Sequence, residues 1–192
     1  MVLARNDRGN KELGFRGVFD GRGYSVNGMR VISARWDEEN YGEAYRWTGF
    51  ISVLSKNGII KDVAFTNASV QYCSYLASWG EGRIENVYVG YTGNYESSYN
   101  STVNATRDSA PSVTMHNCVI SYDTAWTRGY ILGKVNDSVN AYRNVYVIGP
   151  QTKVISYFSS LQNKDGVLNY PLEKDNIAYY SSVGDFLAVR KN

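Results

Sequence analysis

Side chains that could transfer protons or form ion pairs recur at the second position of a repeated six-residue pattern. Because equivalent positions of stacked repeats lie side by side, Glu85 is expected between Lys61 and His116. A carboxylate next to an imidazole is a pairing that general acid–base catalysis uses. The alternation of charge is also typical of a solvent-exposed ladder of ion pairs, and we favour that interpretation. The residues at this second position are, in chain order, Asn27, Lys61, Glu85, His116 and Arg143.

An enzyme acting on polysaccharides would need acids that this position does not supply. Glycoside hydrolases use two carboxyl groups that face one groove, and polysaccharide lyases need a base together with carboxylates for calcium. Asp20 precedes Gly21 and is explained as a turn residue. The remaining acids of interest fall in predicted loops, at Asp108, Asp123 and Asp137. A polysaccharide lyase or glycoside hydrolase is therefore kept as an alternative, and we favour a function that is not enzymatic.

Metal ions and nucleotide cofactors have no recognisable binding motif in the sequence. The chain has 1 His and 2 Cys, the two Cys fall in separate repeats and there is no pair of His at ligand spacing, so a zinc site is not expected. Neither a Gly-x-Gly-x-x-Gly sequence nor a phosphate-binding loop occurs. Cys118 falls at an inward position and is expected to be a buried free thiol, unless the fold brings Cys73 within disulfide distance. We predict no cofactor and no metal.

Aromatic residues in the segments between the repeats form the candidate binding surface. The chain contains 17 Tyr and 4 Trp, of which six fall in two predicted insertions, 33–46 and 90–112, and two more in the equivalent turn of the next repeat. Their rings offer rigid contact area with a polar tip, which suits stacking on sugar rings or contact with another protein. The alternative is that several rings pack against the outside of the fold. The candidate binding residues are Trp36, Tyr41, Tyr45, Tyr91, Tyr95, Tyr99, Tyr122 and Trp126.

The repeated pattern predicts a β-strand that bends in its middle. The first, fourth and sixth residues are apolar and the fifth varies freely, as in a strand with one buried face. The third residue is Asn, Asp or Gly, and these residues tolerate the left-handed backbone conformation at least cost. A bend in every repeat indicates a parallel β-helix, in which Asn86, Asn117 and Asn144 would form a ladder of amides that Asp62 extends. The five copies are 26–31, 60–65, 84–89, 115–120 and 142–147.

The pattern also predicts which side chains are buried and where the insertions emerge. The separation between successive third positions is shortest from Asp62 to Asn86. The longer repeats must carry insertions, which follow the strand and should emerge on one face. The inward residues should form two buried columns. The first is Val63, Val87, Cys118 and Val145, and the second is Phe65, Val89, Ile120 and Val147.

Composition is consistent with one domain of about five to seven repeats, spanning residues 1–192. With 43% hydrophobic residues and a net charge of +2, the chain can build a continuous core and gives no argument for nucleic-acid binding. No apolar run is long enough for a membrane span. We expect the repeat core over 13–150, and the last repeat with the C-terminal cap over 151–192. Residues 182–190 have the Ser, acid and base order of a short capping helix.

The N-terminal end of such a stack is predicted to need a partner. A terminal repeat presents unpaired strand edges, and few residues precede the first predicted strand. We therefore expect other subunits, or further repeats of a longer protein or assembly, to cover this end. A polysaccharide is the other partner that the aromatic residues suit.

Three segments carry a resemblance to a known family: Phe15–Tyr24 (Phe-x-Gly-Val-Phe-Asp-Gly-x-Gly-Tyr), 49–51 and 57–63. They resemble the FDG and GLUG-type repeats of pectin-lyase-like right-handed β-helices, over residues 13–150 and in the closing 181–189. The resemblance implies a right-handed β-helix and a structural or adhesive module of an extracellular assembly, at a virion or bacterial surface. We favour a phage tail or fibre component, with a bacterial cell-surface adhesin as the alternative. The Asp-Asp, Gly-His-Gly and Arg-Ile-Lys signatures of galacturonan hydrolases are missing.

Overall fold

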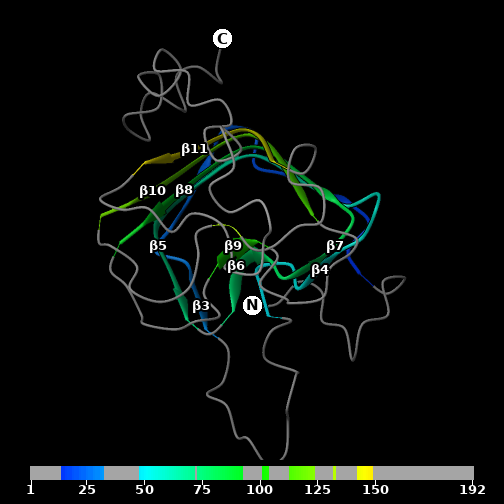
Figure 1. Cartoon of the computed structure of the whole chain (residues 1–192), viewed down its shortest axis with the longest axis horizontal. Helices are drawn as coiled ribbons and strands as arrows, with labels where there is room; N and C mark the ends of the chain where they lie inside the picture. The colour runs from blue at the N-terminus through cyan, green and yellow to red at the C-terminus, as the bar shows by residue number, and fades with distance from the viewer. Residues whose placement is uncertain are drawn as a thin grey trace, which may run out of the picture.

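The computed structural model describes residues 14–32, 48–71, 73–92, 101–103, 113–123, 132 and 142–148. All regular structure in these residues is β-strand, and the strands pair in parallel (Figure 1). The prediction of an all-β protein with parallel strands is therefore confirmed for this part of the chain. The predicted capping helix at 182–190 lies outside the described residues, as do all predicted repeats after 148.

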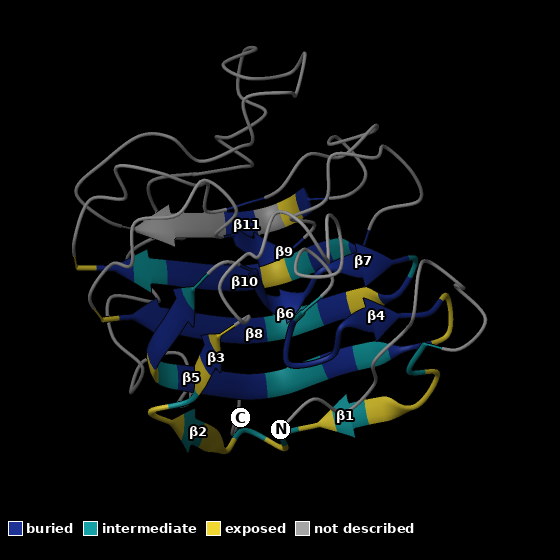
Figure 2. Cartoon of the chain, turned by 90° about the horizontal axis from the view of Figure 1, so that it is seen from below, coloured by how far each residue is buried: buried dark blue, intermediate teal, exposed yellow. Residues whose placement is uncertain are grey.

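The strands form one large sheet and two small ones. In chain order they are β1 (Val18–Asp20), β2 (Ser25–Asn27), β3 (Arg30–Ile32), β4 (Val53–Leu54), β5 (Ile59–Gln71), β6 (Ser74–Ala77), β7 (Trp79–Gly80), β8 (Arg83–Tyr91), β9 (Ser101–Val103), β10 (Thr114–Tyr122) and β11 (Tyr142–Ile148). The large sheet has the order β1-β5-β8-β10-β11, and β2 and β3 also pair with β5. The small sheets pair β4 with β7 and β6 with β9. Figure 2 shows the large sheet as successive rows, with β1 and β2 at one end and β11 at the other.

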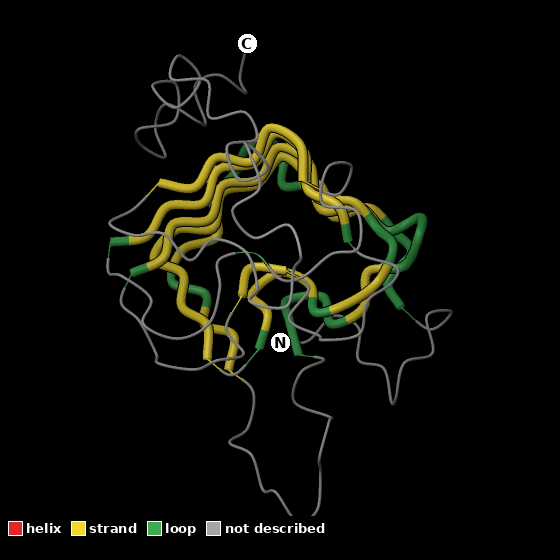
Figure 3. The backbone as a smooth tube through the Cα atoms, viewed as in Figure 1, coloured by secondary structure: helices red, strands yellow, loops and turns green. Residues whose placement is uncertain are grey.

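The chain makes one complete circuit between the start of β5 and the start of β8. β5 runs along one side of the molecule, β6 and β7 return along the opposite side, and β8 begins beside the start of β5 (Figure 3). Ile60 pairs with Ile84, so this circuit has the length predicted for the shortest repeat. Ile84 pairs in turn with Met115, and Met115 with Tyr142. The predicted alignment of the last four copies is therefore confirmed.

The strands of the large sheet bend at the predicted Asn and Asp residues. The φ angles of Asp62, Asn86 and Asn117 are 52°, 57° and 54°, in the left-handed region. Asn86 Nδ2 donates a hydrogen bond to Asp62 Oδ1 at 3.1 Å, so the predicted ladder is confirmed between these two residues. β5 bends a second time at Asn67, with a φ of 50°. The side chain of Asn144 lies outside the described residues.

The predicted alignment of the first copy, 26–31, is wrong. Phe19 pairs with Ile60, and Asp20 with Lys61, so the segment before the predicted copy occupies the equivalent position. Asn27 pairs instead with Thr66, which places Gly28 at the second bend. The error arises because both segments alternate in the same way and glycine tolerates the same backbone conformation as asparagine. The first circuit starts earlier in the chain as a result, and it is longer than predicted.

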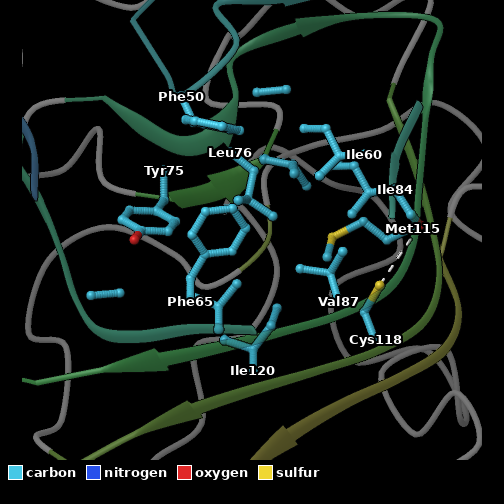
Figure 4. Close-up of a cluster of buried hydrophobic side chains, with 14 of the residues drawn as sticks. Phe50, Ile60, Phe65, Tyr75, Leu76, Ile84, Val87, Met115, Cys118 and Ile120 are labelled. Atoms are coloured by element: carbon cyan, nitrogen blue, oxygen red, sulfur yellow. Dashed lines mark hydrogen bonds between the residues drawn. The ribbon is translucent and has the colours of Figure 1, made fainter. Parts of the chain in front are cut away.

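Both predicted buried columns are found where the structure describes them. Val63, Val87, Cys118 and Val145 are at most 2% exposed, and Phe65, Val89 and Ile120 are at 0%. Figure 4 shows several of these side chains packed together in the interior. Cys118 and Cys73 are both buried free thiols, as expected for Cys118, whose Sγ donates to the Ile84 carbonyl at 3.7 Å. Val147 pairs with Ile120, but its side chain lies outside the described residues.

Aromatic rings connect successive circuits through this core. Neighbouring rings meet edge to face with centroids 5.0, 5.5, 5.6 and 5.4 Å apart, an arrangement that aromatic pairs favour. The chain of contacts runs from the first circuit to the third, through Phe19, Phe50, Phe65, Tyr75 and Tyr91.

The fifth position of the repeat, expected on an exposed face because it varies in sequence, is also buried in three copies. Ala64 and Val119 are fully buried and Tyr88 is 7% exposed, although these residues alternate with the inward side chains. The Tyr88 hydroxyl forms a hydrogen bond with Ser121 Oγ at 2.6 Å. A Cβ atom at Gly90 would lie 2.8 Å from the Tyr88 ring, so a larger residue there would displace the ring. The outer face of the large sheet therefore carries packed residues as well.

Candidate functional site

A row of charged residues crosses the large sheet at the predicted second position. The strands pair Asp20 with Lys61, Lys61 with Glu85, Glu85 with His116, and His116 with Arg143. These five residues are called the charged row below. The predicted column is confirmed for the last four members, and the shifted first circuit contributes Asp20 in place of Asn27. The register of the strands thus brings residues from successive circuits to one line across the sheet.

Lys61 forms ion pairs with two acids at the first end of the charged row, Asp20 of the row and Asp62 beside it. Lys61 Nζ lies 3.1 Å from Asp20 Oδ2 and 3.4 Å from Asp62 Oδ2. The backbone N–H of Arg22 donates to Asp20 Oδ1 at 2.8 Å, and with the Lys61 ammonium it holds the pKa of the Asp20 carboxyl below its ordinary value. The hydrogen bond to Asp20 in turn raises the pKa of Lys61. Both groups stay ionised near neutral pH, which suits an ion pair better than a proton-transfer catalyst.

The middle of the charged row contains the pair considered for proton transfer. Glu85 Oε1 lies 3.2 Å from Arg83 Nε, on the same strand. His116 pairs with Glu85 across β10 and β8, and its Nε2 atom is buried with no hydrogen-bond partner among the described residues. Lys61 separates Glu85 from Asp20 in the row. The described part of the row therefore does not place two acids next to each other.

The described residues provide neither a metal-binding cluster nor a membrane-spanning helix. The described residues contain no cluster of three or more His, Cys, Asp or Glu side chains that could hold a metal ion. They also contain no helix with the length and apolar character to cross a membrane. Of the three loop acids, Asp123 is exposed at the end of β10, and Asp108 and Asp137 lie outside the described residues.

Two candidate binding residues, Tyr91 and Tyr122, are placed in the interior. Tyr91 is 2% exposed and Tyr122 is 6% exposed, so neither belongs to a binding surface. The Tyr91 hydroxyl forms a hydrogen bond with Thr102 Oγ1 at 3.0 Å, and burial raises the pKa of Tyr91 well above its ordinary value. The burial of Tyr91 could have been predicted from the sequence, because Tyr91 continues the inward alternation of Val87 and Val89. Tyr122 continues the same alternation on β10.

The other six candidate binding residues lie outside the described residues: Trp36, Tyr41, Tyr45, Tyr95, Tyr99 and Trp126. The described residues on either side of the insertions still show where the insertions join the fold. Residues 33–47 follow Ile32, which pairs with Gln71. Residues 93–100 follow Thr92, whose N–H donates to the Ala68 carbonyl at 3.1 Å, and precede Ser101, which pairs with Ser74. The circuit of β5 and β6 has only a short connection between these two strands. The circuit before it has the insertion 33–47 at the same position, and the circuit after it has 93–100.

The second predicted insertion, 90–112, is interrupted by the core. Residues 101–103 form β9, whose side chains are buried and which pairs with β6. The Ser101 hydroxyl forms a hydrogen bond with Ser74 Oγ at 2.9 Å. The part between Thr92 and Ser101 is therefore the insertion that shares its position with 33–47.

The described residues thus contain the charged row and one shared position for the two insertions. Comparison of the chain with protein-family models, with curated proteins and with solved structures gives no match.

Proposed function

We propose that the chain is a right-handed parallel β-helix that serves as a structural or adhesive module in an extracellular assembly. We favour a phage tail or fibre component, and a bacterial cell-surface adhesin is the alternative within the same class. Three features support the fold: the parallel register through β1, β5, β8, β10 and β11, the short circuit from Ile60 to Ile84, and the bends at third positions. The β-helix would act as a rigid scaffold, with recognition assigned to the segments inserted into it.

The observation that carries this proposal is the shared position of the two insertions. Segments 33–47 and 93–100 both take the place of the connection between β5 and β6, in the circuits on either side of it. Insertions at one point of a stacked repeat emerge on one face of the stack. The two segments together contain Trp36, Tyr41, Tyr45, Tyr95 and Tyr99. Neighbouring strands are about 4.8 Å apart, a spacing that would suit an elongated polysaccharide or a protein surface.

Binding to immobilised bacterial polysaccharides, measured by biolayer interferometry, tests the proposal. Replacing Tyr95 by Ala should weaken binding by more than about 1 kcal/mol, because aromatic anchors carry much of the energy of such contacts. Lys56→Ala is the control, since Lys56 is exposed at a turn that lies outside both insertions. Equal loss in both variants, or no loss in either, would argue against the insertions as the binding surface.

A polysaccharide lyase or glycoside hydrolase is the second candidate function. It is favoured by one observation, the buried Nε2 of His116, which has no partner among the described residues and belongs to the residue paired with Glu85. A reducing-sugar assay, together with absorbance of unsaturated products, distinguishes it from the binding function. We expect no cleavage by the unmodified chain. Cleavage that disappears in both Glu85→Gln and His116→Gln would support the enzyme instead.

A further inference from the structure

The two ends of the described stack differ in how well the core is covered. Phe19 and Val26 of the first circuit are only partly buried, whereas Ile60 and Phe65, with which they pair, are fully buried. At the other end, Tyr142 of β11 is 1% exposed. Within the described part of the chain, the apolar interior is therefore more open at the β1–β3 end.

The exposed large apolar side chains of the described residues all lie at this same end. Val18 is 54% exposed, Tyr24 is 75% exposed and Ile32 is 47% exposed, and all three lie in the first circuit. Figure 2 shows this circuit as the row with the most exposed colouring. β1, β2 and β3 pair with β5 on one side, and the opposite edge of each strand has no strand partner among the described residues. Such an edge is a template for pairing with another chain.

We propose that the β1–β3 end binds the same end of a second copy of the chain across a two-fold axis. A contact between copies through one shared surface must be isologous, and two-fold dimers are the commonest closed assemblies. A head-to-tail stack would instead need the β11 end, where Tyr142 is already covered. The inference rests on the proposed structural role and names one partner of that module.

Charge and apolar surface select one register for this dimer. Strands related by such an axis run antiparallel. A residue that precedes the axial residue in sequence therefore faces, in the second copy, the residue that follows the axial residue by the same number of positions. With Ser25 on the axis, Asp20 faces Arg30 of the second copy. The same register places Val18 opposite Ile32 of the second copy, so both exposed apolar side chains are buried. β1 of one copy then pairs with β3 of the other, while the two β2 strands pair with each other.

Disulfide cross-linking at the axis tests this register directly. The chain has 2 Cys, both buried, so Ser25→Cys adds an accessible thiol. Ser25 is exposed, and directly opposed residues of an antiparallel pair are within disulfide reach. We expect Ser25→Cys to form a covalent dimer under mild oxidation. Lys56→Cys, at an exposed turn between β4 and β5, is the matched control and should stay monomeric on a non-reducing gel.

Sedimentation equilibrium measures the contribution of charge to the same interface. The unmodified chain should dimerise, and Arg30→Glu should weaken the dimer by about tenfold or more, because Asp20 then faces a second acid. Lys56→Glu makes the same charge change away from the end and should leave the dimer unchanged. A monomeric chain overturns the inference, as does a dimer that neither cross-links through Ser25→Cys nor responds to Arg30→Glu. A monomer that still binds polysaccharide would leave the proposed function standing.

Discussion

At the scale of single residues, the bends show how the sequence encodes the circuit. Asp62, Asn86 and Asn117 adopt positive φ angles at equivalent points of three circuits. These bends could be predicted because Asn and Asp are among the few residues that occupy the left-handed region at low cost. The first circuit could not be aligned correctly, because Gly23 and Gly28 have positive φ angles at its two bends and glycine is compatible with either position.

Substitutions of Asn86 should separate the two roles of this residue. Asn86→Ala removes both the hydrogen bond to Asp62 and the tolerance for a positive φ, so we expect it to lower the free energy of unfolding by about 1–3 kcal/mol. Asn86→Gly keeps the backbone conformation and should cost less than Asn86→Ala. Denaturant unfolding measures both. Asn57→Ala, at an exposed turn, is the control, and an equal effect at Asn57 would contradict the role assigned to the bend.

The hydrogen bond from the Arg22 N–H to Asp20, together with the ion pair to Lys61, should make stability depend on pH in the acid range. The folded-state pKa of Asp20 lies below its ordinary value of 3.8, so the carboxylate contributes stability above that value. This contribution is lost as the pH falls through the folded-state pKa. The difference in melting temperature between the unmodified chain and Asp20→Asn should therefore be largest near neutral pH and shrink in strong acid. A difference that does not change with pH would contradict the lowered folded-state pKa of Asp20.

At the scale of strands, the alternation of side chains was the most informative feature of the sequence. It located the buried columns through Val63, Val87 and Cys118, because a slip of one residue would turn every inward side chain to solvent. It extends beyond the six-residue repeat to Tyr91 and Tyr122, which is why these two tyrosines are in the core and not on a binding surface. The outer packing of Tyr88 could not be predicted, since it depends on Gly90 and Ser121 at different points of two strands.

A charge in the first buried column should prevent folding. Val87 is fully buried in the interior, so Val87→Asp would bury an unpaired carboxylate. We expect Val87→Asp to be insoluble or to lack the cooperative transition of the unmodified chain in circular dichroism. Val87→Ala should fold with reduced stability, since it leaves only a small cavity. A soluble and cooperatively folded Val87→Asp would contradict the register of β8 in the large sheet.

At the scale of the whole molecule, the fold separates a scaffold from the segments inserted into it. The parallel circuits, the aromatic contacts through the core and the charged row form one continuous structure across the described residues. The candidate binding residues other than Tyr91 and Tyr122 all lie in sequence between the described strands. The sequence could place those segments at one point of the repeat, but which side chains meet a ligand depends on contacts that alternation and spacing do not encode.

This separation predicts that one insertion can be shortened without loss of the fold. The circuit containing β5 and β6 needs only residues 70–73 where the next circuit has 93–100 between Thr92 and Ser101. Replacing 93–100 by Gly-Ser-Gly-Ser should change the free energy of unfolding by less than about 1 kcal/mol, because loop closure depends weakly on length. Polysaccharide binding should fall in the same variant. Inserting Gly-Ser-Gly-Ser between Val87 and Tyr88 is the control and should abolish folding, since it breaks the register of β8 with both neighbours. If the shortened chain failed to fold, the insertion would be part of the packed structure, and its aromatic residues would be assigned to covering the scaffold.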